Sequence, residues 1–126
     1  MQNDNYPESS YWAVKLIANH ITNNMVQKYN GHYEYSSKIV DGWDSSAIGV
    51  YYCGYVNSNS VLVTHYVGKG TGDGGVRKRL QDHLREDYWP DVTHFGFKLC
   101  DSAREAEVHE ADEIVRLQPK YNKIGK

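Results

Sequence analysis

The sequence lacks the features that mark several common protein classes. No apolar run approaches the ~20 residues of a membrane-spanning helix, and the first ten residues, MQNDNYPESS, do not have the pattern of a secretory signal peptide. The two cysteines, Cys53 and Cys100, show neither CxxC nor Cys/His ligand spacing, which argues against a zinc site. We interpret them as free thiols and expect a cytoplasmic protein that does not associate with membranes.

Excess positive charge is also missing. The formal net charge is −2, which argues against a protein that simply coats nucleic acid, because such binding comes from neutralising phosphates. A local basic face is compatible with this balance. Basic side chains gather in one segment and again in the tail, at Lys69, Arg77, Lys78, Arg79 and Arg85, and at Lys120, Lys123 and Lys126.

The composition is that of a globular chain. Hydrophobic residues make up 40% and charged residues 24% of 126 residues, and there are no repeats or low-complexity linkers. We therefore predict a single domain over residues 1–126. No pattern indicates the oligomeric state.

The spacing of apolar residues predicts an α/β fold with a small three-stranded antiparallel sheet flanked by helices. The two longest apolar runs are separated by the turn-forming NSNS and so predict a hairpin, whose strands are covered on both faces. The predicted sheet strands are 48–56, 61–67 and 93–100, with a further short strand at 33–40; the predicted helices are 9–30, 76–87 and 102–117.

Turn and capping residues divide these elements. Residues 41–44 (DGWD) predict a turn, and the five glycines from Gly68 to Gly75 predict an irregular loop. Ser102 and Glu105 have the capping-box spacing at the start of the last helix. That helix ends where Gln118 precedes a proline.

The loop at 68–75, with Lys69 and an arginine-led helix after it, is typical of a phosphate-binding segment. A nucleotide P-loop needs GxxxxGK[ST] after a strand. Here the lysine precedes most of the glycines, so that motif is absent. The alternative is a flexible loop with solvated charges.

Short motifs before and after this loop occur together with it in a recognisable order. A Gly-Val-Tyr tripeptide lies on the first hairpin strand and a Tyr-Val-Gly tripeptide ends the second, and the stretch 110–122 reads EADEIVRLQPKYN. This order resembles the GIY-YIG nuclease family, and 110–122 looks like the matching segment of the excision-repair nucleases of that family. The resemblance covers residues 48–124, which we take as the nuclease-like core, with 1–47 as an N-terminal helix and short strand packed on it.

The resemblance implies a metal-dependent endonuclease that hydrolyses DNA with one Mg²⁺ or Mn²⁺ ion held by Glu110. A tyrosine would activate the water, and the implied partner is DNA, with no small-molecule cofactor. The implied catalytic residues are Tyr51, Tyr66, Lys69, Arg79, His83, Glu110 and Asn122, and the implied nucleic-acid contacts are Lys69, Arg77, Lys78 and Arg79.

The chemistry of Glu110 is compatible with that role. It lies at the edge of an apolar stripe, between Ala106 and Ile114, where a carboxylate is costly unless it faces a cleft, an arginine or a cation. The alternative is a salt bridge to a neighbouring helix. One carboxylate suggests one hard metal ion whose other ligands are water and phosphate oxygens. Glu107 would at most support this site without binding the ion itself.

Arg79 is preferred over Arg77 for the scissile phosphate, because in the family a leucine follows the arginine and a histidine or tyrosine lies four residues on. An arginine can bind phosphate through two parallel bonds. The alternative for Arg79 is a solvated helix charge, and for His83 simple packing.

The tyrosines are the candidates for proton transfer. We expect Tyr51 and Tyr66 to face each other, or nearly so, across the hairpin, with Tyr51 as the base and Tyr52 on the opposite face of the strand. Lys69 and the metal would lower the pKa of the base by favouring the phenolate. The alternative is that both rings only pack the sheet.

Four further residues complete the predictions. Asn122 is expected to order the end of the site by bonding backbone or a catalytic side chain. His65, His94 and His109 are expected to be structural.

Two other functions compete with the endonuclease. A catalytically inactive domain of the same fold would bind nucleic acid or a protein partner, and a purely structural α/β module would carry the matching residues by accident. The full set of site residues favours the enzyme.

Overall fold

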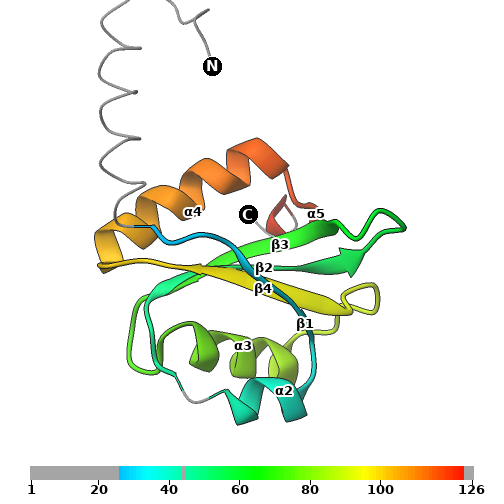
Figure 1. Cartoon of the computed structure of the whole chain (residues 1–126), viewed down its shortest axis with the longest axis horizontal. Coiled ribbons are helices and arrows are strands. Elements are labelled where there is room, and N and C mark those ends of the chain that lie inside the picture. Colours follow the sequence, from blue (N-terminus) through cyan, green and yellow to red (C-terminus); the bar gives the residue numbers. More distant parts are fainter. Residues whose placement is uncertain (1–25, 44, 124–126) are drawn as a thin grey trace, which may run out of the picture.

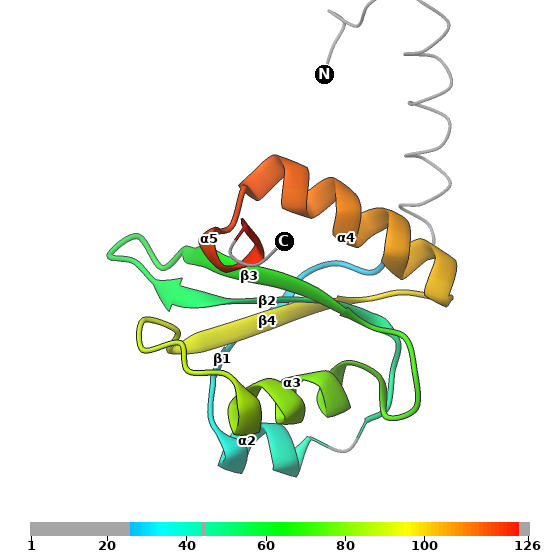
Figure 2. The same cartoon turned by 180° about the vertical axis from the view of Figure 1, so that it is seen from behind.

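The computed structural model describes residues 26–43 and 45–123, which form one antiparallel sheet with helices on both faces. Helices α2 and α3 cover one face and α4 covers the other (Figure 1, Figure 2). The elements are β1 (Asn30–Glu34), α2 (Ser37–Gly42), β2 (Gly49–Val56), β3 (Leu62–Gly70), α3 (Gly75–Glu86), β4 (His94–Leu99), α4 (Ala103–Leu117) and α5 (Lys120–Lys123).

The sheet has four strands in the order β1-β4-β2-β3. Its central strand β2 is buried over its first six residues, as predicted for an apolar run that is covered on both faces. The hairpin partner β3 is an edge strand and is only partly buried. One side of β3 is therefore open to the surface, and this position decides where the candidate site lies.

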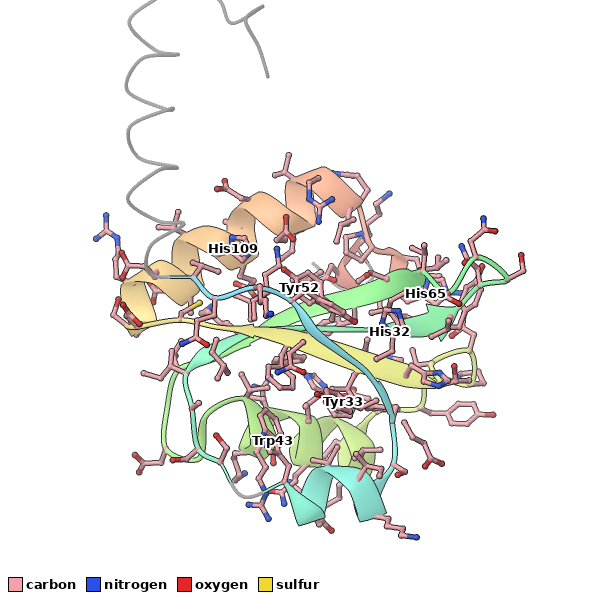
Figure 3. The ribbon with its side chains drawn as sticks, viewed as in Figure 1. His32, Tyr33, Trp43, Tyr52, His65 and His109 are labelled. Atoms are coloured by element: carbon pink, nitrogen blue, oxygen red, sulfur yellow. The ribbon has the colours of Figure 1, made fainter. Side chains whose placement is uncertain are left out.

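Alternation along β2 divides the core into two layers. Tyr51 belongs to the layer between the sheet and α2 and α3, and Tyr52 to the layer under α4, so the prediction that they face opposite ways is confirmed. Figure 3 shows Tyr52 and His109 on the α4 side of the sheet and Trp43 on the other side.

The sheet contains one strand more than the predicted three. The extra strand β1 pairs antiparallel with β4 at the far edge. Residues 9–25 of the predicted first helix lie outside the described residues, and its predicted end at 26–30 is wrong, because Val26 bridges Cys100 and Asn30 already belongs to β1. Pairing with β4 satisfies the backbone hydrogen-bonding groups of this short polar segment, whose residues have little preference for strands.

The segment after β1 also differs from its prediction. The strand predicted over 33–40 ends at Glu34, and helix α2 follows because the Ser36 side chain accepts a bond from the amide of Ile39 at 3.3 Å. Asp41 and Gly42 close α2 instead of forming a turn, and Asp44 is outside the described residues.

The glycine segment is more regular than predicted. Strand β3 continues to Gly70 and α3 begins at Gly75, so the loop is only 71–74. Gly75 has a φ of +58°, and a side chain there would collide with the carbonyl oxygen of Ala47, which accepts a bond from the Val76 amide at 3.0 Å. This glycine therefore makes room for the protein's own backbone and not for a ligand.

The remaining elements agree with their predictions. The hairpin forms with its turn after Val56, and α3 ends at Glu86. Ser102 caps α4 by accepting a bond from the amide of Glu105 at 3.2 Å. No described helix has the length and apolar character that crossing a membrane requires.

Candidate functional site

A polar pocket of about 350 Å³ opens at the edge of the sheet where β3 ends. Because β3 is an edge strand, side chains from both faces of the sheet meet around it. Arg79 comes from α3 on one face and Glu110 from α4 on the other. The lining residues are Tyr66, Lys69, Thr71, Gly72, Arg79 and Glu110.

Glu110 is paired with a strand lysine in this pocket. Its Oε1 lies 3.3 Å from Lys69 Nζ, and the Glu110 side chain is 19% exposed. The alternative of a salt bridge is thus realised, although with β3 and not with a helix. Over the described part of the chain, the second carboxylate oxygen has no protein partner. Glu107 is exposed and does not line the pocket.

The two candidate arginines have different surroundings. Arg79 lines the pocket, and its side chain is 44% exposed with a long 3.4 Å contact to Asp82. Arg77 instead donates to the carbonyl oxygens of Val40 at 3.2 Å and Asp41 at 2.9 Å, and so joins α3 to α2. Arg79 therefore has a guanidinium available to a ligand, whereas that of Arg77 is used in the fold.

Only two of the four predicted nucleic-acid contacts reach the pocket. Lys69 and Arg79 line it, but Lys78 forms an exposed pair with Asp82 at 2.7 Å on the surface of α3. The predicted cluster of basic residues is thus divided between the pocket, the helix surface and the α2 contact of Arg77.

Behind the pocket, Tyr51 begins a hydrogen-bonded chain. Its hydroxyl lies 2.7 Å from Nε2 of His83, and Nδ1 of His83 lies 2.7 Å from Oδ2 of Asp87. An ionised carboxylate only accepts bonds, so Nδ1 carries the proton and Nε2 accepts the Tyr51 hydroxyl. Burial lowers the pKa of His83, against the opposing effect of Asp87, so the imidazole is neutral at pH 7.

The two tyrosines nearly face each other, as predicted, but from diagonal positions of the hairpin. Tyr51 pairs across the hairpin with Gly68, and Tyr66 pairs with Cys53, so their rings are diagonal neighbours with centroids 6.1 Å apart. A side chain on Gly68 would lie 2.5 Å from Cζ of Tyr51, so this glycine makes room for the phenol ring. Tyr51 is fully buried, and Tyr66 is the tyrosine that lines the pocket.

The hydroxyl pKa values shift in the opposite direction to the one expected. Burial raises the pKa of Tyr51 well above its ordinary value, and burial also raises that of Tyr66. Arg79 lowers both, and in the protein alone it takes the role that was expected of Lys69.

Asn122 bonds backbone at the open edge of β3. Its Oδ1 accepts from the Val67 amide at 2.8 Å, and its Nδ2 donates to the Val67 carbonyl oxygen, also at 2.8 Å. These are the bonds that a further strand would make. Asn122 thus fixes the strand between Tyr66 and Gly68 without lining the pocket.

Sequence reasoning missed two residues beside the pocket. Asp87 follows His83 by four residues on one helix face, a spacing that could have identified it. Trp89 places its ring centroid 4.9 Å from that of Tyr66 and 4.8 Å from that of His83. No local sequence signal predicts this contact.

The other histidines make contacts away from the pocket. His65 lies 3.4 Å from Asp91, and His94 bonds the neighbouring Thr93 at 2.8 Å. His109 lies 3.3 Å from the Tyr52 hydroxyl, in the layer under α4.

A larger cavity of about 410 Å³ lies on the α4 side, beside Tyr52 and Glu113. Its buried carboxylate is already satisfied, because Glu113 accepts from Tyr52 at 2.7 Å and from Arg116 at 2.7 and 2.8 Å. Burial would raise the pKa of Glu113, but these bonds lower it to about 2. The pocket at β3 is the stronger candidate site because its charged groups are only loosely paired.

Comparisons of the chain with protein-family models, curated proteins and solved structures return no match.

Proposed function

We propose that this protein is a metal-dependent endonuclease of the GIY-YIG type, that its substrate is DNA, and that the pocket at the β3 edge is its active site. The observation that carries the proposal is the meeting of Tyr66, Lys69, Arg79 and Glu110 in one polar pocket. They come from three elements and span 45 positions of the chain, counted from 66 to 110. Two cations and one carboxylate match the charges of a phosphodiester and a divalent ion.

Glu110 is the residue that would hold the Mg²⁺ or Mn²⁺ ion. A carboxylate oxygen without a protein partner in a polar pocket is a hard ligand of the kind these ions prefer. When bound, the ion supplies positive charge beside the phosphate and makes a water molecule more acidic. Lys69 bonds the other oxygen and so orients the carboxylate.

Arg79 stabilises the phosphoryl oxygens as negative charge grows on them. Its planar guanidinium can donate two parallel bonds to a phosphate, which a lysine ammonium cannot do. The long contact with Asp82 leaves it free to turn towards a ligand. Arg77 has no such freedom, since its guanidinium is bonded to the backbone of α2.

Tyr66 is the tyrosine that can reach a water molecule in the pocket. Burial raises its pKa, while Arg79 opposes that increase. For Tyr66 to take the proton of the water, its own proton must leave; we place it on Tyr51, whose ring centroid lies 6.1 Å from that of Tyr66, as the proton of Tyr51 moves along its 2.7 Å bond to Nε2 of His83. Asp87 then stabilises the imidazolium. Tyr66 replaces Tyr51 as the proposed base because Tyr51 has no exposed surface.

The competing function is an inactive domain of the same type that binds nucleic acid or a protein partner. The Lys69–Glu110 pair would then be a structural ion pair. Within the described residues no three histidine, cysteine, aspartate or glutamate side chains gather as metal ligands, so metal binding depends on Glu110.

Replacement of Glu110 distinguishes the two functions. Plasmid and oligonucleotide DNA are incubated with the protein and Mg²⁺, with and without EDTA. We expect cleavage that EDTA stops and that Glu110→Gln slows by about 10²-fold or more, the scale of losing one charge-stabilising group. Glu107→Gln, an exposed carboxylate on the same helix, is the matched control and should cut normally. A wild-type rate in Glu110→Gln, or no cleavage by the wild type, refutes the proposal.

A further inference from the structure

A row of aromatic rings begins at the pocket and continues along the outer side of β3. Tyr66 lines the pocket and contacts Trp89, whose ring stacks on Tyr121 at 5.4 Å and 17°. Tyr121 meets His65 at 6.0 Å, and His65 meets Tyr55 at 5.4 Å. We call this set, together with Tyr88, the aromatic surface: Tyr55, His65, Tyr66, Tyr88, Trp89 and Tyr121.

Two members of the aromatic surface are exposed to an extent that folding does not explain. Tyr88 is 87% exposed and Tyr55 is 39% exposed. Tyr88 belongs with this set because it directly precedes Trp89 in the chain, in the segment between α3 and β4. Burial stabilises an aromatic side chain only when it removes the ring from water, so a ring as open as Tyr88 gains little from the fold.

A β-bulge makes the row continuous. Cys53 pairs with Tyr66 and Gly54 pairs with Thr64, which leaves His65 as an extra residue in β3. Consecutive residues of a regular strand face opposite ways, but a bulge redirects a side chain. As a result, His65 and Tyr66 both contact the same group of rings. Figure 3 shows His65 near the start of β3, close to the hairpin turn.

The charges on the aromatic surface cancel and so suit a neutral, flat ligand. Asp91 accepts from the Tyr121 hydroxyl at 2.6 Å and pairs with Lys120 and His65, so its charge is compensated. Lys120 is 52% exposed and lies 5.1 Å from the Tyr121 ring centroid. The surface therefore offers ring faces beside a compensated ion pair, and the cations for a phosphate are those of the pocket, Lys69 and Arg79.

Nucleic-acid bases are flat rings that stack on aromatic side chains whatever their sequence, and each stacked base contributes ~1–3 kcal/mol. Bases inside a duplex already stack on each other and do not offer their faces. A strand that places its phosphate beside Arg79 and Lys69 and runs along β3 would bring its bases to Trp89, Tyr88 and Tyr121 only if those bases were unpaired.

We propose that the substrate is a strand that is unpaired beside the cut, with bases stacked on the aromatic surface. The proposal rests on the proposed function for the position of the cut. The binding itself can be measured independently of cleavage. DNA and RNA share the stacking chemistry, so both are included in the test.

The test measures binding of the wild-type protein in EDTA, where a metal-dependent nuclease does not cut. Fluorescence anisotropy is recorded with a labelled single-stranded DNA, the same strand in a duplex, and the RNA of the same sequence. We expect single strands to bind at least ~10-fold more tightly than the duplex, and Tyr88→Ala to weaken single-strand binding ~5- to 100-fold. Tyr88→Phe, which retains the ring, should bind as the wild type does.

The exposure of Tyr88 makes its replacement a safe test of binding, because the fold does not depend on this side chain. Equal affinity for single strand and duplex, or unchanged affinity in Tyr88→Ala, overturns the proposal even if the protein cleaves DNA. A single-strand preference that Tyr88→Ala removes supports it, even in a protein that cleaves nothing. The outcome is therefore separate from that of the cleavage assay with Glu110→Gln.

Discussion

Asn122→Ala tests whether this residue acts through the backbone of β3 or through the substrate. The variant removes both bonds to Val67, whose side chain is fully buried. It leaves an amide and a carbonyl group without partners at the edge of the strand that carries Tyr66 and Lys69. We therefore expect Asn122→Ala to lower stability first, and activity only as a consequence of a less ordered strand.

The expected loss of stability follows from those two groups. An unpaired buried backbone group costs ~1–3 kcal/mol, so together they cost about 2–4 kcal/mol after partial hydration at the strand edge. For a domain of this size, each 1 kcal/mol lowers the melting temperature by about 4 °C, which gives a decrease of ~8–16 °C. Lys123→Ala, an exposed position in the same helix α5, should change the melting temperature by less than ~2 °C.

The assay combines thermal unfolding, followed by circular dichroism, with single-turnover cleavage at a temperature where both variants are folded. A role in positioning predicts a large decrease in melting temperature and a moderate decrease in rate. If Asn122→Ala melted like the wild type but had lost its cleavage activity, the residue would act on the substrate and the backbone interpretation would be wrong.

Three further predictions concern the pocket and its surroundings. Tyr66→Phe should slow cleavage by ~10²–10⁴-fold, the usual contribution of a general base, whereas Tyr51→Phe with the greater defect in single-turnover rates would return the role to Tyr51. Arg79→Lys should lower the cleavage rate but not the melting temperature. Arg77→Lys should lower the melting temperature but not the cleavage rate, because the Arg77 guanidinium is bonded to α2. The same changes in both variants would contradict the assignment of Arg79 to the phosphate. In the folded protein the pKa of Glu113 is lowered from 4.5 to about 2, so its carboxylate stabilises the fold above pH 4.5 and this contribution is lost as the pH falls towards 2. Glu113→Gln should therefore make the melting temperature depend less on pH between 4.5 and 2. The same pH dependence in the variant and the wild type would show that the bonds of Glu113 do not stabilise the fold.

The hairpin and the last two long helices could be predicted because their signals are local. Apolar runs separated by NSNS determine β2 and β3, and the capping residues Ser102 and Glu105 determine the start of α4. The fourth strand was predicted with the wrong bounds (33–40) and without its place in the sheet, since β1 is short, polar and stabilised by its pairing with β4. Residues 37–42 carry β-branched side chains, and the helical cap of Ser36 decided their structure.

The lining of the candidate site was predicted only in part: Tyr66, Lys69, Arg79 and Glu110 line the pocket, whereas Tyr51, His83 and Asn122 do not. Motif order identified Arg79 and Glu110, and the structure brings both into one pocket. The relation between Tyr51 and Tyr66 depends on strand register and a bulge, which no single-strand pattern encodes. The pKa directions depend on burial, which outweighs the nearby cations.

The position of the pocket at the rim of the sheet determines what kind of polymer it can accept. A site enclosed within a barrel or between domains admits a chain only from its end, and so limits an enzyme to removing terminal units. Among the described residues no further strand pairs with β3 on the side away from β2, where Asn122 of α5 bonds its backbone, and α5 lies beside β3 (Figure 2). In the proposed endonuclease, a long polymer would therefore lie across the pocket with continuous chain on both sides, and it would dock in mid-length without threading.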